Sequence, residues 1–286
     1  MRVQTLRSYA KINLFLDVGK KIKKTKLHNI QSLTFLTNIY DEIQIKKNNY
    51  PKDIIRFYGQ FGNYIGKNNN SLKQSLLLLR KRGFIKKKYH YDIWVGKNIP
   101  VFAGLGGGSS NAATIIRYFI KKKALSNQDI DYFSKIIGSD IRLFFKSSQI
   151  FQKNLYKVRN LKKKYKFYFI LVYPFLKCST KEIYKKLKVF KKIKNRNTYQ
   201  RNSKMELANS LKLETNSLEQ VVISKFTIIK EILNELNLVK DCHFSRVTGS
   251  GSACFGLFSK KKSADLGLRK IKKKFPKFWC VVGKTI

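Results

Sequence analysis

The sequence predicts an α+β protein built from two domains. Its length of 286 residues corresponds to roughly two domains of about 150 residues each, and with 43% hydrophobic residues each half can bury a core. Strand-like and helix-like patterns are mixed in both halves, which is typical of two-layer α+β domains. Between 152 and 166 the chain becomes basic and weakly patterned. We therefore expect one domain at 1–153 and a second at 154–286.

In the first half, strand-like alternation and helix-like apolar stripes follow one another. The alternation of apolar and polar residues predicts strands at 11–18, 42–46 and 91–95. Apolar residues at helical spacing, with Leu72, Leu76, Leu77 and Leu79 as one stripe, predict helices at 71–82, 109–123 and 128–137.

The second half begins with a strongly apolar segment and continues with helical patterns. Strands are expected at 167–173, 253–258 and 279–282. Helices are expected at 179–190, 217–222, 223–238 and 263–275. The polar, basic segment 191–204 is interpreted as a surface loop.

The charge balance limits the classes of partner. The chain has 61 Lys and Arg against 16 Asp and Glu, a formal net charge of +45, which excludes an acidic solvating protein and suits polyanionic partners or substrates. Nucleic-acid-binding proteins usually gather their basic residues on one helix, arm or stripe, whereas the lysine runs at 86–88, 162–164 and 272–274 are dispersed. We interpret the charge as compositional drift and do not expect a nucleic-acid partner.

The cysteines and the apolar runs indicate the compartment. Cys178, Cys242, Cys254 and Cys280 are far apart and form no C-x-x-C pair, so they suit neither a zinc site nor a disulfide framework. The chain shows neither a signal-peptide pattern nor an apolar run of the roughly 20 residues that a membrane span needs. We expect a soluble cytoplasmic protein without a membrane partner, as a monomer or weak homodimer.

The strongest local signal is the segment 100–113, PVFAGLGGGSSNAA. Glycines in series allow tight turns that point successive N–H groups into one concavity, and a helix opening at Ser109 adds its positive end. The segment is not a Walker A loop, because it contains no G-x-x-x-x-G-K-[ST]. It is not a dinucleotide fingerprint either, because Ser109 occupies the third glycine position. The alternative is a flexible turn before a capped helix. We favour a phosphate-binding loop.

Three further features carry possible chemistry. Asp140 is a lone carboxylate in an apolar segment, so it is either a helix N-cap or a partly buried base. Lys11 is a single cation in an alternating strand and would, taken alone, face solvent. The segment 248–252, TGSGS, is a second glycine loop or simply a tight turn before the strand at 253–258.

Taken together and in order, four segments resemble the motifs of the GHMP kinase superfamily. They are 10–16 (AKINLFL), 104–113 (GLGGGSSNAA), 138–140 (GSD) and 248–251 (TGSG). Within that superfamily they are similar to the 4-diphosphocytidyl-2-C-methyl-D-erythritol kinase family, with weaker similarity at 70–72, 174–184 and 216–219. The resemblance implies the two-domain GHMP kinase fold, with an N-terminal ribosomal-protein-like α/β domain and a C-terminal ferredoxin-like α+β domain.

The activity that this resemblance implies is ATP-dependent phosphorylation of the 2-hydroxyl of 4-diphosphocytidyl-2-C-methyl-D-erythritol, a CDP-linked methylerythritol of the non-mevalonate isoprenoid route. ATP and Mg²⁺ are the implied cofactors, with the metal ligands unassigned. Asp140 would take the hydroxyl proton, and Lys11 would orient Asp140 and hold charge at the transferring phosphoryl.

The resemblance also implies the binding residues. Those that would cradle the ATP phosphates are Pro100, Val101, Phe102, Ala103, Gly104, Leu105, Gly106, Gly107, Gly108, Ser109 and Ser110. Lys97 and Asn70 would lie near the adenine. His28 would form hydrogen bonds with the edge of the cytosine ring, and Tyr184 would stack on the face of that ring. Further substrate contacts would come from Asn13, Thr180, Thr248 and Gly249.

The chain departs from the family pattern at three positions. Leu27 replaces the tyrosine of the usual Asp-Gly-Tyr-His, so one aromatic partner for cytosine is missing. Arg142 replaces a proline, and Ser217 stands where aspartate is common. The alternatives to this function are another GHMP kinase, acting on homoserine or mevalonate, and a basic RNA-binding protein on a related fold.

Overall fold

The computed structural model describes residues 3–23, 25–66, 70–120 and 125–286. The chain folds into two compact units, each assembled from separate segments. Unit 1 comprises Met1–Ala10, Ile39–Val101 and Gly106–Phe145, and unit 2 comprises Lys11–Asn38, Phe102–Leu105 and Lys146–Ile286. The division is therefore interleaved along the chain, and the domain bounds 1–153 and 154–286 stay a prediction.

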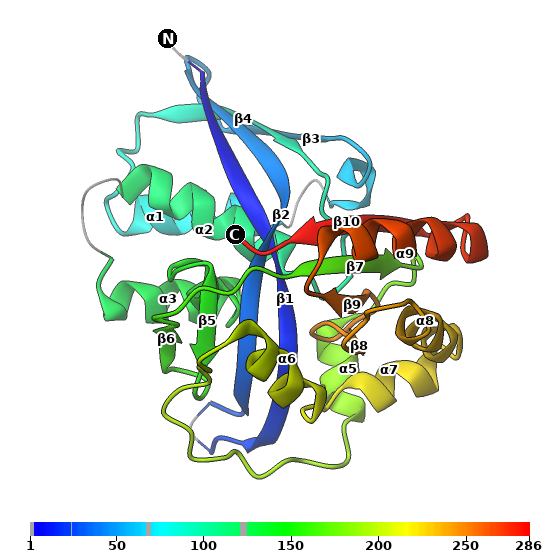
Figure 1. The fold of residues 1–286 in the computed structure, drawn as a ribbon. Helices are drawn as coiled ribbons and strands as arrows, with labels where there is room; N and C mark the ends of the chain where they lie inside the picture. The colour runs from blue at the N-terminus through cyan, green and yellow to red at the C-terminus, as the bar shows by residue number, and fades with distance from the viewer. Residues whose placement is uncertain (1–2, 24, 67–69, 121–124) are drawn as a thin grey trace. The chain divides into compact units, whose positions relative to one another are not determined.

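Unit 1 combines strands with a group of helices (Figure 1). Strand β4 (His90–Gly96) pairs parallel with β3 (Ile54–Tyr58) and antiparallel with the end of β2 (His28–Asn48). The helices are α1 (Ser71–Lys81), α2 (Gly107–Ile120), α3 (Asn127–Ile137) and α4 (Ile141–Phe144), with the short 3₁₀ helix Gly62–Tyr64. Helix α2 packs against α1 and α4. The strands and helices bury apolar residues such as Ile45, Ile93, Leu76 and Ile116.

Unit 2 contains a four-stranded antiparallel sheet in the order β10-β7-β9-β8. Its strands are β7 (Tyr168–Tyr173), β8 (Ser245–Val247), β9 (Cys254–Phe258) and β10 (Trp279–Lys284). Helices α8 (Ile228–Asn237) and α9 (Lys261–Lys274) pack against this sheet (Figure 1). The remaining elements are α5 (Thr180–Lys186), α6 (Lys204–Lys212), α7 (Glu219–Lys225), β5 (Gln149–Gln152) and β6 (Val158–Asn160).

Two long strands, β1 (Gln4–Lys21) and β2, pair with each other and contribute residues to both units. In unit 2, the first half of β2 also pairs antiparallel with β5, from Ser32 opposite Gln152 to Phe35 opposite Gln149. Every residue of β1 from 10 to 19 is buried. The polar residues that alternate along this strand are therefore held inside the protein.

The α+β prediction is confirmed, and the differences lie in the extent of individual elements. Strand β1 extends beyond 11–18 on both sides, and β2 begins well before the predicted 42–46. Helix α2 begins at Gly107 rather than 109, and 121–123 lie outside the described residues. The helix predicted at 179–190 ends at Lys186, because Leu187 is already extended. Among the described helices, none is long and apolar enough to cross a membrane.

Candidate active site

The glycine loop ends directly in the first turn of α2. Gly104 and Gly106 adopt φ values of +76° and +71°, a left-handed conformation that favours glycine. The Ser110 N–H donates to the Gly106 carbonyl at 2.9 Å, which closes the first helical turn. The first N–H groups of a helix lack partners within it and carry its positive end. This loop and helix start therefore have the chemistry of an anion site.

Within unit 2, the loop residues 102–105 pack against two other predicted motifs. The Lys11 N–H donates to the Leu105 carbonyl at 2.9 Å, and the Ala253 N–H donates to the Ala103 carbonyl at 3.2 Å. A Cβ on Gly104 would lie 2.2 Å from the Thr248 carbonyl oxygen. Only glycine allows so close an approach, so the two glycine loops pack backbone to backbone.

Lys11 lies at the centre of a polar cluster in unit 2. Its side chain is 3% exposed, so the expectation of a solvent-facing lysine is wrong. Its ammonium donates to Asn13 Oδ1 and lies beside Gly249, where a Cβ would be 3.0 Å from Nζ. The Asn13 N–H donates to Thr248 Oγ1 at 3.0 Å. The fold thus brings Lys11, Asn13, Thr248 and Gly249 together.

Thr180, at the start of α5, joins the same cluster. Its hydroxyl lies 3.0 Å from the hydroxyl of Ser250, within hydrogen-bonding distance. Asn13 is oriented by Ser32 and Thr34 of β2, whose hydroxyl oxygens accept from its Nδ2 at 2.8 and 3.0 Å. Five residues predicted for substrate binding or catalysis, from three distant parts of the sequence, therefore meet within unit 2.

Asp140 belongs to unit 1, at the N-cap position of α4. Its backbone is helical, with φ −66° and ψ −19°, and its side chain makes no capping hydrogen bond, so the N-cap interpretation does not account for the carboxylate. The residue is half-buried, and α4 packs against α2. Its assignment as the base stays a prediction.

Lys97 and Asn70, predicted near the adenine, have clear structural partners in unit 1. The Lys97 ammonium is 2% exposed and donates to Asp41 and, at 3.3 Å, to Asn111 Oδ1. Burial lowers the pKa of Lys97, and the Asp41 carboxylate opposes that shift.

Asn70 caps α1 by accepting from the Lys73 N–H at 3.0 Å. The next residue, Ser71, donates its hydroxyl to the Gly108 carbonyl at 2.8 Å.

His28 lies in an aromatic group of unit 2. Its Nδ1 is 2.9 Å from the Gly19 carbonyl, an acceptor, so Nδ1 carries the proton and a neutral ring offers Nε2 as an acceptor. The Phe190 ring stacks on His28 at 5.2 Å and 22°, and the Tyr184 ring lies at 5.6 Å and 40°. Leu27 is 50% exposed. His28 and Tyr184 are therefore neighbours, with Phe190 as an additional aromatic side chain.

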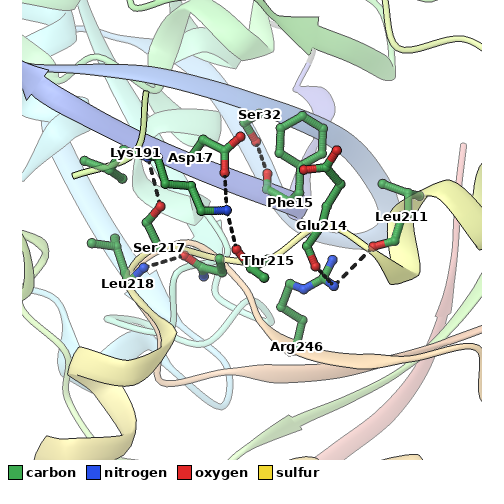
Figure 2. Close-up of polar contacts among 12 residues, drawn as sticks. Phe15, Asp17, Ser32, Lys191, Leu211, Glu214, Thr215, Ser217, Leu218 and Arg246 are labelled. Carbon is green, nitrogen blue, oxygen red and sulfur yellow. Dashed lines mark hydrogen bonds and ion pairs between the residues drawn. The ribbon is translucent and has the colours of Figure 1, made fainter. Parts of the chain in front are cut away.

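A buried arginine secures the middle of β1. Arg246 is 4% exposed, and its guanidinium donates to the backbone carbonyls of Leu14, Leu211 and Glu214. Figure 2 shows it reaching Leu211 and Glu214. Burial lowers the pKa of Arg246 to about 10, and the nearby Glu219 and Glu214 carboxylates oppose that shift, so the group stays charged at neutral pH.

An ion pair between Lys191 and Asp17 attaches the segment after α5 to β1. Lys191 Nζ lies 2.9 Å from Asp17 Oδ1 and donates to Thr215 Oγ1 at 2.6 Å (Figure 2). The Lys191 N–H donates to the Val18 carbonyl at 2.9 Å. The first residue of the predicted surface loop 191–204 is therefore packed against β1.

Sequence reasoning did not single out Asp41, Phe190 or Arg246. Asp41 had a usable signal, since it is a carboxylate in the otherwise strand-like segment 39–45 of a chain that is poor in acids. Arg246 is a lone cation two residues before the second glycine loop. Phe190 gives no comparable signal, because a single aromatic residue beside a helix is just as well explained by packing in the hydrophobic core as by a binding site.

Comparisons with known proteins agree with this arrangement. The model of the GHMP kinases N terminal domain matches residues 70–139, and that of the GHMP kinases C terminal matches 190–277. The chain is 38% identical over 283 residues to a 4-diphosphocytidyl-2-C-methyl-D-erythritol kinase of Pelagibacter ubique (strain HTCC1062), covering 98% of both chains.

Solved structures share the fold at lower sequence identity. A crystal structure of 4-(cytidine 5'-diphospho)-2C-methyl-D-erythritol kinase aligns with a TM-score of 0.74 at 20% identity, covering 99% of this chain and 100% of that one. A homoserine kinase from Cytophaga hutchinsonii aligns with a TM-score of 0.71 at 15% identity, covering 100% and 95%. These two likenesses establish the fold, whereas the 38% identity along the whole chain establishes the family. The chain belongs to the 4-diphosphocytidyl-2-C-methyl-D-erythritol kinase family of the GHMP kinases.

Proposed function

We propose that this protein transfers the terminal phosphoryl group of ATP to the 2-hydroxyl of 4-diphosphocytidyl-2-C-methyl-D-erythritol. The observation that carries the proposal is the cluster in unit 2 of buried Lys11, Asn13, Thr248 and Gly249, with Thr180 at its exposed edge. A buried ammonium beside the Asn13 amide, with the Thr248 hydroxyl in the same cluster, suits a phosphorylated, hydroxyl-rich substrate. The membership of the chain in the kinase family supports the same reaction.

The phosphates of ATP would occupy the glycine loop at 100–110 and the start of α2. The left-handed glycines and the helix N-terminus present N–H groups for the phosphate oxygens. Such a site binds by geometry and dipoles, which is what phosphoryl transfer mainly requires of a protein. Asn70 and Lys97 would contribute chiefly through the segments that they hold, since both side chains have partners within unit 1.

In the proposed chemical step, Asp140 accepts the proton of the 2-hydroxyl as that oxygen forms its bond to the terminal phosphorus. The bond from this phosphorus to its bridging oxygen breaks, and ADP leaves with the electron pair. Lys11 supplies positive charge to the transferring group, whose negative oxygens need stabilisation during transfer. Because Lys11 is only 3% exposed, little water screens its charge. Its attraction for the phosphoryl oxygens is therefore stronger than that of an exposed lysine.

The cytidine would be held at His28 with Tyr184. A neutral His28 ring offers Nε2 as an acceptor, which matches the amino group of cytosine. Tyr184 offers an aromatic face beside it, and aromatic faces are sequence-tolerant platforms for bases.

Mg²⁺ would arrive mainly on the ATP phosphates. Among the described residues there is no group of three or more His, Cys, Asp and Glu side chains that could hold a metal ion. Mg²⁺ at nucleotide sites usually keeps waters and substrate phosphates as most of its ligands, so this chain suits that mode of binding. When bound, the ion would neutralise phosphate charge.

The proposed setting is the cytoplasm, with the enzyme as a monomer or weak homodimer.

A coupled assay for ADP release, with the three candidate alcohols in parallel, tests the function. We expect turnover with 4-diphosphocytidyl-2-C-methyl-D-erythritol and a much lower kcat/KM with homoserine or mevalonate, with the product identified by mass spectrometry. A higher kcat/KM for either of the other alcohols would reject the substrate assignment. Salt-dependent RNA binding without any nucleotide turnover would instead favour the RNA-binding alternative.

A further inference from the structure

Asp41, near the middle of β2, is a fully buried carboxylate that accepts hydrogen bonds from four donors. Its Oδ1 accepts from the backbone N–H groups of Asn98 and Ile99 at 2.9 and 2.8 Å. Its Oδ2 accepts from Asn111 Nδ2 at 2.9 Å and from the Lys97 ammonium. One side chain therefore joins the segment before the glycine loop to the first turns of α2.

The hydrogen bonds continue along the start of α2. Asn111 Nδ2 also donates to Ser8 Oγ at 2.9 Å, and Ser8 donates in turn to Ser110 Oγ at 2.8 Å. All of these side chains are nearly or fully buried. The amide of Asn111 thus uses both of its protons within the network, one on Asp41 and one on Ser8.

The network also touches the glycine loop itself. A Cβ on Gly107 would lie 3.3 Å from Lys97 Nζ and 3.1 Å from Ile99 Cγ2. The Lys97 ammonium therefore lies directly beneath the first residue of α2, at the end where the helix carries positive charge. Without a counter-charge, this buried cation would be costly to hold there.

Stability alone does not account for such a pair, because burying two charges removes their hydration and apolar residues of similar volume often serve as well. Its geometry instead fixes two backbone segments relative to each other. We propose that Asp41 is the positioning residue of the nucleotide loop, holding residues 97–99 and the start of α2 in the geometry that receives the ATP phosphates. Since Asp41 is 0% exposed, it acts through these segments and without touching the nucleotide.

This inference rests on the proposed function, in which the loop binds ATP. Pre-organised donors bind a ligand more tightly because no ordering cost remains at the moment of binding. Removing Asp41 should therefore weaken ATP binding and leave the binding of the alcohol substrate largely unchanged.

Asp41→Asn is the direct test. The asparagine oxygen can still accept from the two backbone N–H groups, but its NH₂ cannot accept from Lys97. The ammonium therefore loses its charged partner and keeps only the Asn111 Oδ1 at 3.3 Å. We expect the KM for ATP and the dissociation constant of a non-hydrolysable ATP analogue to rise at least tenfold. The KM for the alcohol substrate should change less than threefold, with all assays run well below the Tm of the variant.

Asp53→Asn is the matched control. Asp53 lies in unit 1 and accepts from Arg80 at 2.6 and 2.9 Å and from the Tyr91 N–H at 3.0 Å, and both of these donors lie outside the loop and α2. Its loss should lower the Tm while leaving the affinity for the analogue within threefold. Equal effects of Asp41→Asn and Asp53→Asn on ATP affinity would overturn the inference.

If Asp41→Asn does not fold, the double variant Asp41→Asn/Lys97→Met takes its place, because it removes both buried charges together. A raised dissociation constant for the analogue in that variant supports the inference, and an unchanged one overturns it. If the wild-type protein does not bind the analogue at all, the proposed function fails. If wild type and variants bind it equally, only the positioning role fails.

Discussion

The guanidinium of Arg246 donates a hydrogen bond to the backbone carbonyl of Leu14, 232 positions away in the sequence. Leu14 directly follows Asn13 on β1, and Arg246 lies two residues before Thr248. Asn13 and Thr248 are themselves hydrogen-bonded at 3.0 Å. This contact therefore aligns the strand that carries Lys11 with the loop that carries Gly249.

Replacing Arg246 by methionine should destabilise the protein. The carbonyls of Leu14 and Glu214 would lose a buried charged donor, whereas the Leu211 carbonyl keeps the Glu214 N–H at 3.1 Å. Each unsatisfied buried group costs about 1–3 kcal/mol. We expect Arg246→Met to lower the free energy of unfolding by about 2–4 kcal/mol, measured by urea denaturation. Arg159→Met, at an exposed arginine of β6, should change it by less than about 0.5 kcal/mol. Equal effects of the two variants would contradict a structural role for Arg246.

Asp140→Asn should abolish most of the turnover. The amide is nearly isosteric but cannot accept the substrate proton, and a general base typically contributes about 10²–10⁴-fold. The KM for ATP and the Tm should stay close to those of the wild type, because the Asp140 side chain does not cap α4. ADP release and thermal melting measure both effects. Retention of activity within a factor of about 3 would exclude Asp140 as the base.

Gly104→Ala should disrupt the junction of the two glycine loops. The new Cβ would lie 2.2 Å from the Thr248 carbonyl at a φ of +76°, so the backbone must move. We expect a loss of about 2–4 kcal/mol in unfolding free energy, from the overpacking and the strained φ together. Gly108→Ala is the control, since its Cβ would meet only Ser71 Oγ, at 3.6 Å. A Gly104→Ala protein as stable as Gly108→Ala would contradict this close approach.

Tyr184→Ala should weaken binding of the cytidine substrate. Stacking of a base on an aromatic side chain is worth about 1–3 kcal/mol, so its KM should rise roughly five- to a hundred-fold, with little change for ATP. Phe190→Ala should act in the same direction, because Phe190 stacks on His28. Leu27→Tyr should tighten binding by restoring an aromatic ring. Tyr184 also packs against the core of unit 2, so a fall in Tm with equal losses for both substrates would reveal a purely structural residue.

Asp129 should make the unfolding free energy of the protein depend on pH in the acidic range. Hydrogen bonds from Ser126, followed by that from Arg82, lower the pKa of the Asp129 carboxyl. A lowered folded pKa stabilises the protein above the unfolded value of about 3.9, and this contribution is lost as the pH falls through the folded pKa. Asp129→Asn should therefore lower the unfolding free energy at pH 7 by about 1 kcal/mol.

The difference between Asp129→Asn and wild type should shrink as the pH falls below 4, which denaturant titrations at pH 7 and pH 3 would detect. Asp131→Asn in the same helix serves as the control, because its side chain is 61% exposed in its pair with Arg142. Exposed pairs contribute about 0–1 kcal/mol. A difference for Asp129→Asn that is independent of pH would show that the charge of the carboxylate is not what stabilises the cap.

The extent of the elements shows where local patterns fail. Local patterns do not predict a strand at 28–41, because Gln31, Ser32, Thr34 and Thr37 interrupt its apolar residues. All four side chains are nevertheless fully buried in β2. Hydrogen bonds from distant residues make this burial possible, as with Asn13 on Ser32 and Thr34. A polar residue looks solvent-exposed in sequence unless its partner is known.

The sequence by itself determined those features that depend only on residues close together along the chain. The left-handed turns at Gly104 and Gly106, the helix that follows them and the order of the four motifs can be read from short segments, because backbone preferences and helix starts are local. Only the tertiary structure decided that Lys11 is buried and that Asp41 pairs with Lys97. It also decided that Phe190 stacks on His28 and that Arg246 reaches Leu14. Burial and charge pairing depend on which distant segments pack together, and local residue patterns do not encode that choice.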